Sequence, residues 1–166
     1  MTKGEDTAMF YPVKRFKQAL SQEECIALLK RERRAVLSVV TEDGYPYASP
    51  VNHWYCEADG KLYFHGGMTG HKIDCMKAND RVCLCVMDGG TPVEDGWWQR
   101  VKSVVVFGRV EFIEDYDRVV EISRALSHQF TQDEAYIDAE IRGHARRTLV
   151  CAVTIEHMTG KTVNER

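Results

Sequence analysis

The sequence has no long apolar run, no excess of positive charge and no recognisable export signal. No stretch approaches the roughly 20 consecutive apolar residues that a membrane-spanning helix needs, and the N-terminus "MTKGEDTAMFYPVKRF" lacks an apolar signal core. The formal net charge of the 166 residues is -3, so no overall positive field would attract nucleic acid. We therefore expect a cytoplasmic protein that binds neither membranes nor nucleic acids.

Two familiar catalytic motifs are also missing. No Gly-x-Ser-x-Gly sequence marks a hydrolase nucleophile. A phosphate-binding P-loop requires Gly-Lys-Ser/Thr five residues after its first glycine. Counting from Gly66, the sequence has His71 in place of that glycine, and Ile73 follows Lys72. The nucleotide-triphosphatase loop is therefore excluded.

The cysteines form no Cys-x-x-Cys pair. There are six: Cys25, Cys56, Cys75, Cys83, Cys85 and Cys151. Without an export signal, reduced thiols acting as small apolar side chains are expected. His71 and Cys75 stand four residues apart on a predicted helix, but zinc sites need three or four ligands at closer paired spacings, so we expect no metal.

The pattern of apolar residues predicts a mainly β protein with flanking helices. Asp-Gly pairs at 43–44 and 59–60 are hairpin signals between apolar runs. The expected strands cover about 34–41, 46–56, 61–66, 81–88, 97–115 and 148–163, and the expected helices 21–33, 69–78, 117–130 and 133–145. This order favours a six-stranded antiparallel barrel with helices outside it. We expect disorder in residues 1–10 and a single domain in residues 11–166.

The stretch "FHGGMTGHK" (residues 64–72) combines glycines with two adjacent cationic or near-cationic side chains at a predicted helix start. Thr69 is a candidate N-cap, which would put His71 and Lys72 in the first helical turn. Cations are unfavourable there because the helix dipole is positive at that end. A bound phosphate would resolve the mismatch. A solvated turn with two surface donors fits the spacing equally well.

Other residues suggest contact with a ligand or a partner. Pro50 lies inside a predicted strand, where it implies an edge, a bulge, or a gap in which a ligand replaces a strand. Asn52 beside it offers both a donor and an acceptor to a planar polar ring. In "WWQR", adjacent indoles cannot share one face of a strand, so at least one is expected to point away from its own core.

The blocks "GYPYASPVNHWY…DGKLYFHGGMTGHKIDCMKANDRVCLCVMD" and "KSVVVFGRVEFIED" resemble the FMN-binding split-barrel superfamily of pyridoxamine 5′-phosphate oxidase. More narrowly, they resemble its branch related to 5-nitroimidazole antibiotic resistance proteins. The similarity covers residues 11–158. It implies a six-stranded split β-barrel that forms a homodimer, with FMN bound at the subunit interface.

The resemblance also assigns roles to individual residues. It implies that the flavin ring lies against a strand, that the phosphate is held at a helix start, and that the neighbouring subunit reaches the site. The matching positions are Ser49, Pro50, Val51 and Asn52 for the ring, Thr69, His71 and Lys72 for the phosphate, Ser103 near the cofactor, and Trp98 and Arg100 for the neighbouring subunit.

The implied activity is that of a flavin-dependent oxidoreductase acting on a small molecule, with a nitro group as the candidate electron acceptor. His65 is the best candidate for an acid or base, and it also lies among the expected cofactor-binding residues. Pyridoxamine phosphate oxidation is disfavoured, because Ile155 stands where that enzyme type carries an arginine two residues before His157.

Two alternatives remain at this level. The same barrel could be a non-catalytic flavin- or haem-binding module, with His65, His71 or His157 as iron ligand. It could also be a structural dimer without a cofactor. A visible spectrum distinguishes a bound flavin, a bound haem and neither.

Overall fold

The computed structural model describes residues 10–93 and 96–165. The disorder expected for residues 1–10 therefore falls, except for Phe10, outside the described residues. The elements in chain order are η1 (Phe16–Gln18), α1 (Gln22–Arg31), β1 (Arg34–Val40), β2 (Pro46–Cys56), β3 (Lys61–Gly67), α2 (His71–Ala78), β4 (Arg81–Met87), β5 (Thr91–Pro92), β6 (Gln99–Ile113), α3 (Tyr116–His128), α4 (Glu134–His144), η2 (Ala145–Arg147) and β7 (Thr148–Glu165).

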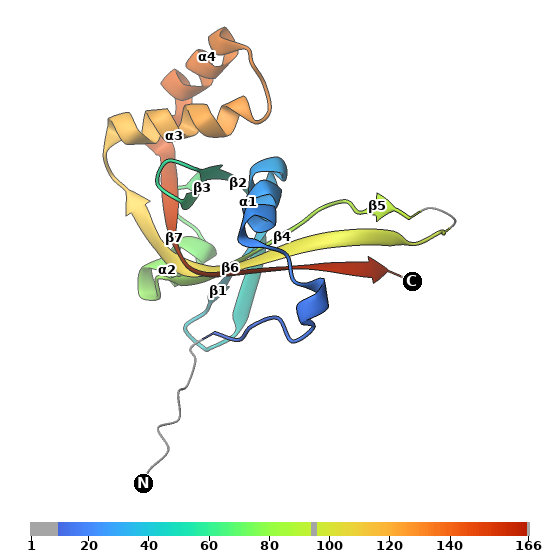
Figure 1. The fold of residues 1–166 in the computed structure, drawn as a ribbon. Helices are drawn as coiled ribbons and strands as arrows, with labels where there is room; N and C mark the ends of the chain where they lie inside the picture. The colour runs from blue at the N-terminus through green and yellow to red at the C-terminus, as the bar shows by residue number, and fades with distance from the viewer. Residues whose placement is uncertain (1–9, 94–95, 166) are drawn as a thin grey trace.

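Six strands form a closed antiparallel ring. The order is β4-β1-β2-β3-β7-β6, and β6 pairs back onto β4 to complete the circuit. The two-residue β5 pairs only with β6. The helices flank the ring, with α3 and α4 stacked together at one end of the molecule (Figure 1). The predicted mainly antiparallel fold with flanking helices is confirmed.

Glycines allow the tight connections that the sequence indicated. Gly44 and Gly60 have φ angles of 86° and 69°, in the left-handed region that glycine adopts without steric cost. Gly108 lies at a register shift between β6 and β7, where a β-carbon would come within 2.3 Å of the Thr154 carbonyl oxygen. Both predicted hairpins are confirmed.

Apolar side chains from every ring strand meet inside the ring. Fully buried members include Leu37, Leu62, Phe64, Leu84, Val104, Val106 and Val153. Helix α1 adds Cys25, Leu28 and Leu29, and α2 adds Ile73, Cys75 and Met76. Each large aliphatic side chain buried in this way contributes roughly 1.5–3 kcal/mol. This core fixes the positions of both helices relative to the strands.

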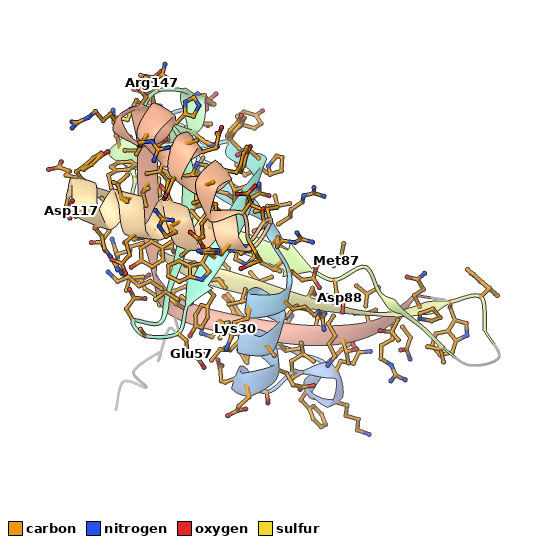
Figure 2. The ribbon with its side chains drawn as sticks, turned by 90° about the horizontal axis from the view of Figure 1, so that it is seen from above. Lys30, Glu57, Met87, Asp88, Asp117 and Arg147 are labelled. Carbon is orange, nitrogen blue, oxygen red and sulfur yellow. The ribbon has the colours of Figure 1, made fainter. Side chains whose placement is uncertain are left out.

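The two longest strands continue beyond the ring as an arm. Residues 99–102 of β6 pair with residues 162–165 of β7, and β5 joins their edge. Asp88 anchors the base of the arm, because one of its oxygens accepts hydrogen bonds from the amides of Gly90 and Lys102. Its other oxygen pairs with Arg31 at 3.1 Å. Figure 2 shows Met87 and Asp88 at this junction.

All six cysteines are free, as expected. Within the described residues, none of the helices has both the length and the apolar content needed to cross a bilayer. The same residues contain no group of three or more His, Cys, Asp or Glu side chains placed to hold a metal ion.

Candidate functional site

Strands β2 and β3 pair over only part of their lengths. They are joined from His53–Phe64 to Cys56–Lys61. Residues 46–52 of β2 pair with β1 alone, and residues 65–67 of β3 pair with β7 alone. Two strand edges therefore face each other without a shared ladder. We call this opening the split.

Pro50 lies on the β2 side of the split. It is paired with Val36 of β1 and has no partner on its other side among the described residues. A strand position with a free edge accommodates proline, which has no N–H to give to a second ladder. Of the possibilities raised by the sequence, the pairing shows a strand edge at Pro50. Pro50 and Asn52 are exposed, whereas Val51 is buried.

A buried hydroxyl also lies on this edge. Ser49 is half-buried, and its Oγ is inaccessible to solvent with no hydrogen-bond partner among the described residues. A buried polar group without a partner costs free energy, so such groups often belong to binding sites. The four predicted ring-contacting residues therefore occupy one edge of the split.

Helix α2 begins beside the split, but its cap differs from the prediction. Thr69 is not the N-cap, and the helix does not begin at residue 69. The N-cap is Gly70, whose φ of 139° favours glycine, and no side chain caps the helix. The carbonyl oxygen of Gly70 accepts from the amides of Ile73 and Asp74. Among the described residues, the amides of His71 and Lys72 have no acceptor, so they remain available to an anion.

The side chain of Lys72 turns towards β3. It lies over Gly66, where a β-carbon would be 3.7 Å from Lys72 Cε and 3.8 Å from Nζ. Burial raises the pKa of the Cys151 thiol to about 12, and the Lys72 ammonium opposes part of that rise. The Lys72 ammonium therefore lies close enough to Cys151, on the inner wall, to influence the ionisation of its thiol.

The side chain of His71 turns the other way, towards β2. Its ring packs edge-on against Tyr47, with 4.8 Å between centroids. Nε2 is 3.9 Å from the Cys75 sulfur. The two cationic side chains predicted as a pair therefore diverge and flank the split, one against each strand. Neither forms an ion pair with a carboxylate of the described residues.

His65 forms the β3 side of the opening. Desolvation by the surrounding protein, and secondly the Lys72 ammonium, lower the pKa of its imidazole below the usual range. The ring is therefore neutral at pH 7 and can both donate and accept a hydrogen bond. With Asn52, it lines a small cavity of about 180 Å³ that Leu126, Ser127 and Phe130 complete.

A second cavity adjoins His65, and the sequence analysis did not anticipate it. It has a volume of about 220 Å³ and lies between the split and the helix pair α3–α4. Tyr136, Glu140 and His144 line it from α4. These residues stand at i, i+4 and i+8, so a polar stripe on one helical face was the available signal.

The remaining predicted residues lie elsewhere in the chain. Ser103 is on β6, paired with Met87 of β4 and Lys161 of β7. Arg100 lies in the arm, and Trp98 precedes it. In the ring order β6 is separated from both β2 and β3, so these three do not join the split within one chain. Trp97 is 87% exposed, as expected for one of two adjacent indoles.

Comparison with known families adds to this geometry. The model described as pyridoxamine 5′-phosphate oxidase matches residues 21–162. The chain belongs to the pyridoxamine 5′-phosphate oxidase family. Comparison with curated proteins gave no match.

Several solved structures resemble this chain in fold. A candidate 5-nitroimidazole antibiotic resistance protein from Bacteroides thetaiotaomicron is 25% identical, with 88% of this chain and 87% of that chain covered and a TM-score of 0.76. An FAD-binding protein from Mesorhizobium loti is 27% identical, with 88% and 97% covered and a TM-score of 0.62. An FAD- and haem-binding protein from Mycobacterium smegmatis is 24% identical, with 87% and 72% covered and a TM-score of 0.68.

Proposed function

We propose that this family member is a flavin-binding oxidoreductase that holds FMN in the split. The observation that carries the proposal is the arrangement of His71 and Lys72, which flank the opening and form no ion pair with a carboxylate of residues 10–93 and 96–165. A phosphate at the start of α2 would meet both side chains and the free amides of the first turn. The similar FAD-binding protein from Mesorhizobium loti supports a flavin as the ligand class.

The residues along the split fit such a group. The Ser49 hydroxyl, which is covered by protein and has no hydrogen-bond partner within residues 10–93 and 96–165, borders the position proposed for the ring. Exposed Asn52 offers an amide donor and acceptor beside it. Thr69, also exposed, lies next to the helix start and adds a hydroxyl near the phosphate position. Polar groups of the chain therefore face both ends of a flavin.

When bound, FMN supplies reversible two-electron chemistry that the side chains themselves lack. The chain would contribute orientation and proton handling. The neutral imidazole of His65 can hold a proton on either ring nitrogen and exchange it with a substrate in the adjoining cavity. Leu126 gives the His65–Asn52 cavity a buried apolar wall.

A homodimer would complete the site. Pro50, Val36, Cys85 and Val105 are paired in succession across β2, β1, β4 and β6, so their side chains form one outward-facing row. Exposed apolar surface of this kind is typical of interaction sites. The row runs from the split to the neighbourhood of Ser103, and a second copy seated on it would bring its own Ser103, Trp98 and Arg100 towards the split.

A nitroaromatic compound is the substrate class that we propose. The similar protein from Bacteroides thetaiotaomicron, a candidate 5-nitroimidazole resistance protein, supports it. Pyridoxamine phosphate fits less well, since Ile155 replaces a cation and His157 stacks on Phe10 at 4.8 Å. Free thiols throughout the described residues suit the reducing cytoplasm, which we propose as the location.

The decisive experiment is a visible absorption spectrum of the purified protein before and after addition of FMN. We expect flavin bands that persist after gel filtration, and flavin oxidation when a nitroaromatic compound is added to the reduced protein. A colourless protein that retains no FMN would contradict the proposal. A Soret band without flavin bands would favour the haem-binding alternative.

A further inference from the structure

The cavity of about 220 Å³ beside His65 takes most of its lining from α3, α4 and the segment that connects them. This helix pair lies at one end of the molecule (Figure 1). His65 joins the lining from β3, so the cavity and the split share this side chain. Pockets for drug-sized ligands measure roughly 300–1,000 Å³. The smaller volume here suits a single ring with a short substituent.

Helix α4 is fixed against α3, so the side chains that it presents to the cavity are held in place. Ile137 and Ile141 are buried in an apolar cluster that α4 shares with α3. Arg124 of α3 pairs with Glu134 at 2.8 Å and with Asp138 at 2.5 Å. Two of the three carboxylates within α4 therefore already have a cation as their partner.

Glu140 is the third carboxylate of α4, and it lines the cavity. Within residues 10–93 and 96–165 its ion-pair contact is with His144, whose Nε2 lies 3.7 Å from Glu140 Oε2. This distance is too long for a hydrogen bond. Arg147 donates to Nδ1 of His144 at 3.3 Å, and a nitrogen that accepts from a guanidinium carries no proton. The His144 ring is therefore neutral and leaves the Glu140 charge without a counter-ion.

The rest of the lining is uncharged and partly aromatic. None of the described residues that line the cavity is a lysine or an arginine. The exposed rings of Phe130 and Tyr136 and the buried side chain of Ile141 supply its apolar surface. A carboxylate beside aromatic rings recognises an aromatic compound that carries an ammonium group. An anionic compound would instead meet the Glu140 charge with no lining cation to offset it.

We propose that this cavity binds a small aromatic ring bearing a positive charge, with Glu140 as its counter-ion. The same compound would present its other end to His65 and the flavin in the split. Glu140 thereby selects cationic members among nitroaromatic substrates. The role of the occupant as a substrate rests on the proposed function, whereas its binding to the cavity does not.

The binding test uses benzylamine, an aromatic cation without a nitro group. Benzyl alcohol and phenylacetate are its neutral and anionic analogues of similar size. Each compound is titrated into the full chain, with and without saturating FMN, while amide chemical shifts are recorded. We expect benzylamine to shift α4 amides near Tyr136 and His144, and to bind about fivefold or more tightly than benzyl alcohol. Phenylacetate should bind more weakly than either.

The variant Glu140→Gln removes the charge and keeps the size of the side chain. It should lower benzylamine affinity about fivefold or more and change benzyl alcohol affinity much less. Asp117→Asn is the matched control, because Asp117 (labelled in Figure 2) is exposed in the first turn of α3 and does not line the cavity. Circular dichroism first establishes that both variants are folded.

Turnover is measured separately, as reoxidation of the reduced, FMN-loaded protein by 4-nitrobenzylamine and by 4-nitrobenzyl alcohol. In these compounds the nitro group and the amine or hydroxyl stand at opposite ends of one ring. We expect Glu140→Gln to raise the half-saturating concentration of the amine more than that of the alcohol, because the lost contact contributes to binding.

The outcomes separate the cavity from the flavin site. Equal binding of benzylamine and benzyl alcohol to the wild type, or equal losses in the Glu140 and Asp117 variants, would overturn the inference. If benzylamine binds as expected but the protein retains no FMN, the cavity stands as a cation site and the proposed oxidoreductase fails. If nitroaromatic compounds reoxidise the flavin with no dependence on Glu140, the proposed oxidoreductase stands and the selection by Glu140 fails.

Discussion

The ammonium end of Lys72 lies against Gly66, so that a β-carbon on this glycine would be 3.8 Å from Lys72 Nζ. The glycine leaves open the backbone of β3 where the strand borders the split. The opening therefore has the Lys72 cation at one edge and the His71 imidazole at the other, although the net charge of the chain is negative.

Replacement of Lys72 by glutamine should weaken FMN binding. Loss of one charge-assisted phosphate contact costs about 1.5–3 kcal/mol, or roughly ten- to a hundredfold in affinity. Quenching of flavin fluorescence during titration measures this. Lys77→Gln, an exposed position in the last turn of the same helix, is the control and should bind FMN normally. Equal affinities for both variants would rule out a phosphate at the helix start.

Replacement of Val36 by glutamate should dissociate the proposed dimer. Val36 is 44% exposed in the single chain and lies between Pro50 and Cys85 in the apolar row. A buried, unpaired carboxylate at that position would be costly. Gel filtration with light scattering should give a dimer for the wild type and a monomer for the variant. Ala135→Glu on exposed α4 should leave the mass unchanged; a Val36 variant that stays dimeric would place the interface elsewhere.

Alanine at Gly70 and at Gly143 should have opposite effects on stability. Neither added β-carbon would meet an atom within 4 Å, so packing does not distinguish them. Gly70 has a φ of 139°, which should cost alanine about 1–3 kcal/mol. Gly143 lies inside α4, where alanine is favoured by about 0.5–1 kcal/mol. Urea unfolding measures both changes; stabilisation by Gly70→Ala would contradict the observed start of α2.

His53 should make the protein less stable in mild acid. The ring is fully buried, its Nε2 donates to the Leu29 carbonyl at 3.0 Å, and burial lowers its pKa. Below pH 6.5 the unfolded chain takes up a proton that the folded chain resists, so unfolding becomes easier as pH falls. The contribution reaches at most about 1.4 kcal/mol per pH unit.

The measurement compares urea unfolding of the wild type and His53→Gln at pH 7.5 and pH 5.5. The variant lacks the titrating group, so its loss of stability between these two pH values should be smaller. The comparison within each protein cancels the general destabilisation caused by the substitution. Identical pH dependence in the two proteins would show that His53 does not resist protonation.

Local signals were enough to predict much of the fold. The Asp-Gly turns at 43–44 and 59–60 depend on residues close in sequence and on steric limits of the backbone, and both are present in the structure. The prediction of Thr69 as N-cap was wrong because side-chain chemistry alone cannot show that the preceding turn needs the left-handed backbone of Gly70.

The sequence by itself determined the alternation of the strands, the position of a proline within one of them, and the presence of two cationic side chains at a helix start, since these depend on neighbours along the chain. Only the tertiary structure decided that His71 and Lys72 diverge to opposite strands, that α4 contributes Glu140 to a cavity beside His65, and that Ser103 lies away from the split. Closure of the ring between β4 and β6 sets how far apart these residues lie. Such long-range strand pairing is not encoded in any local sequence pattern.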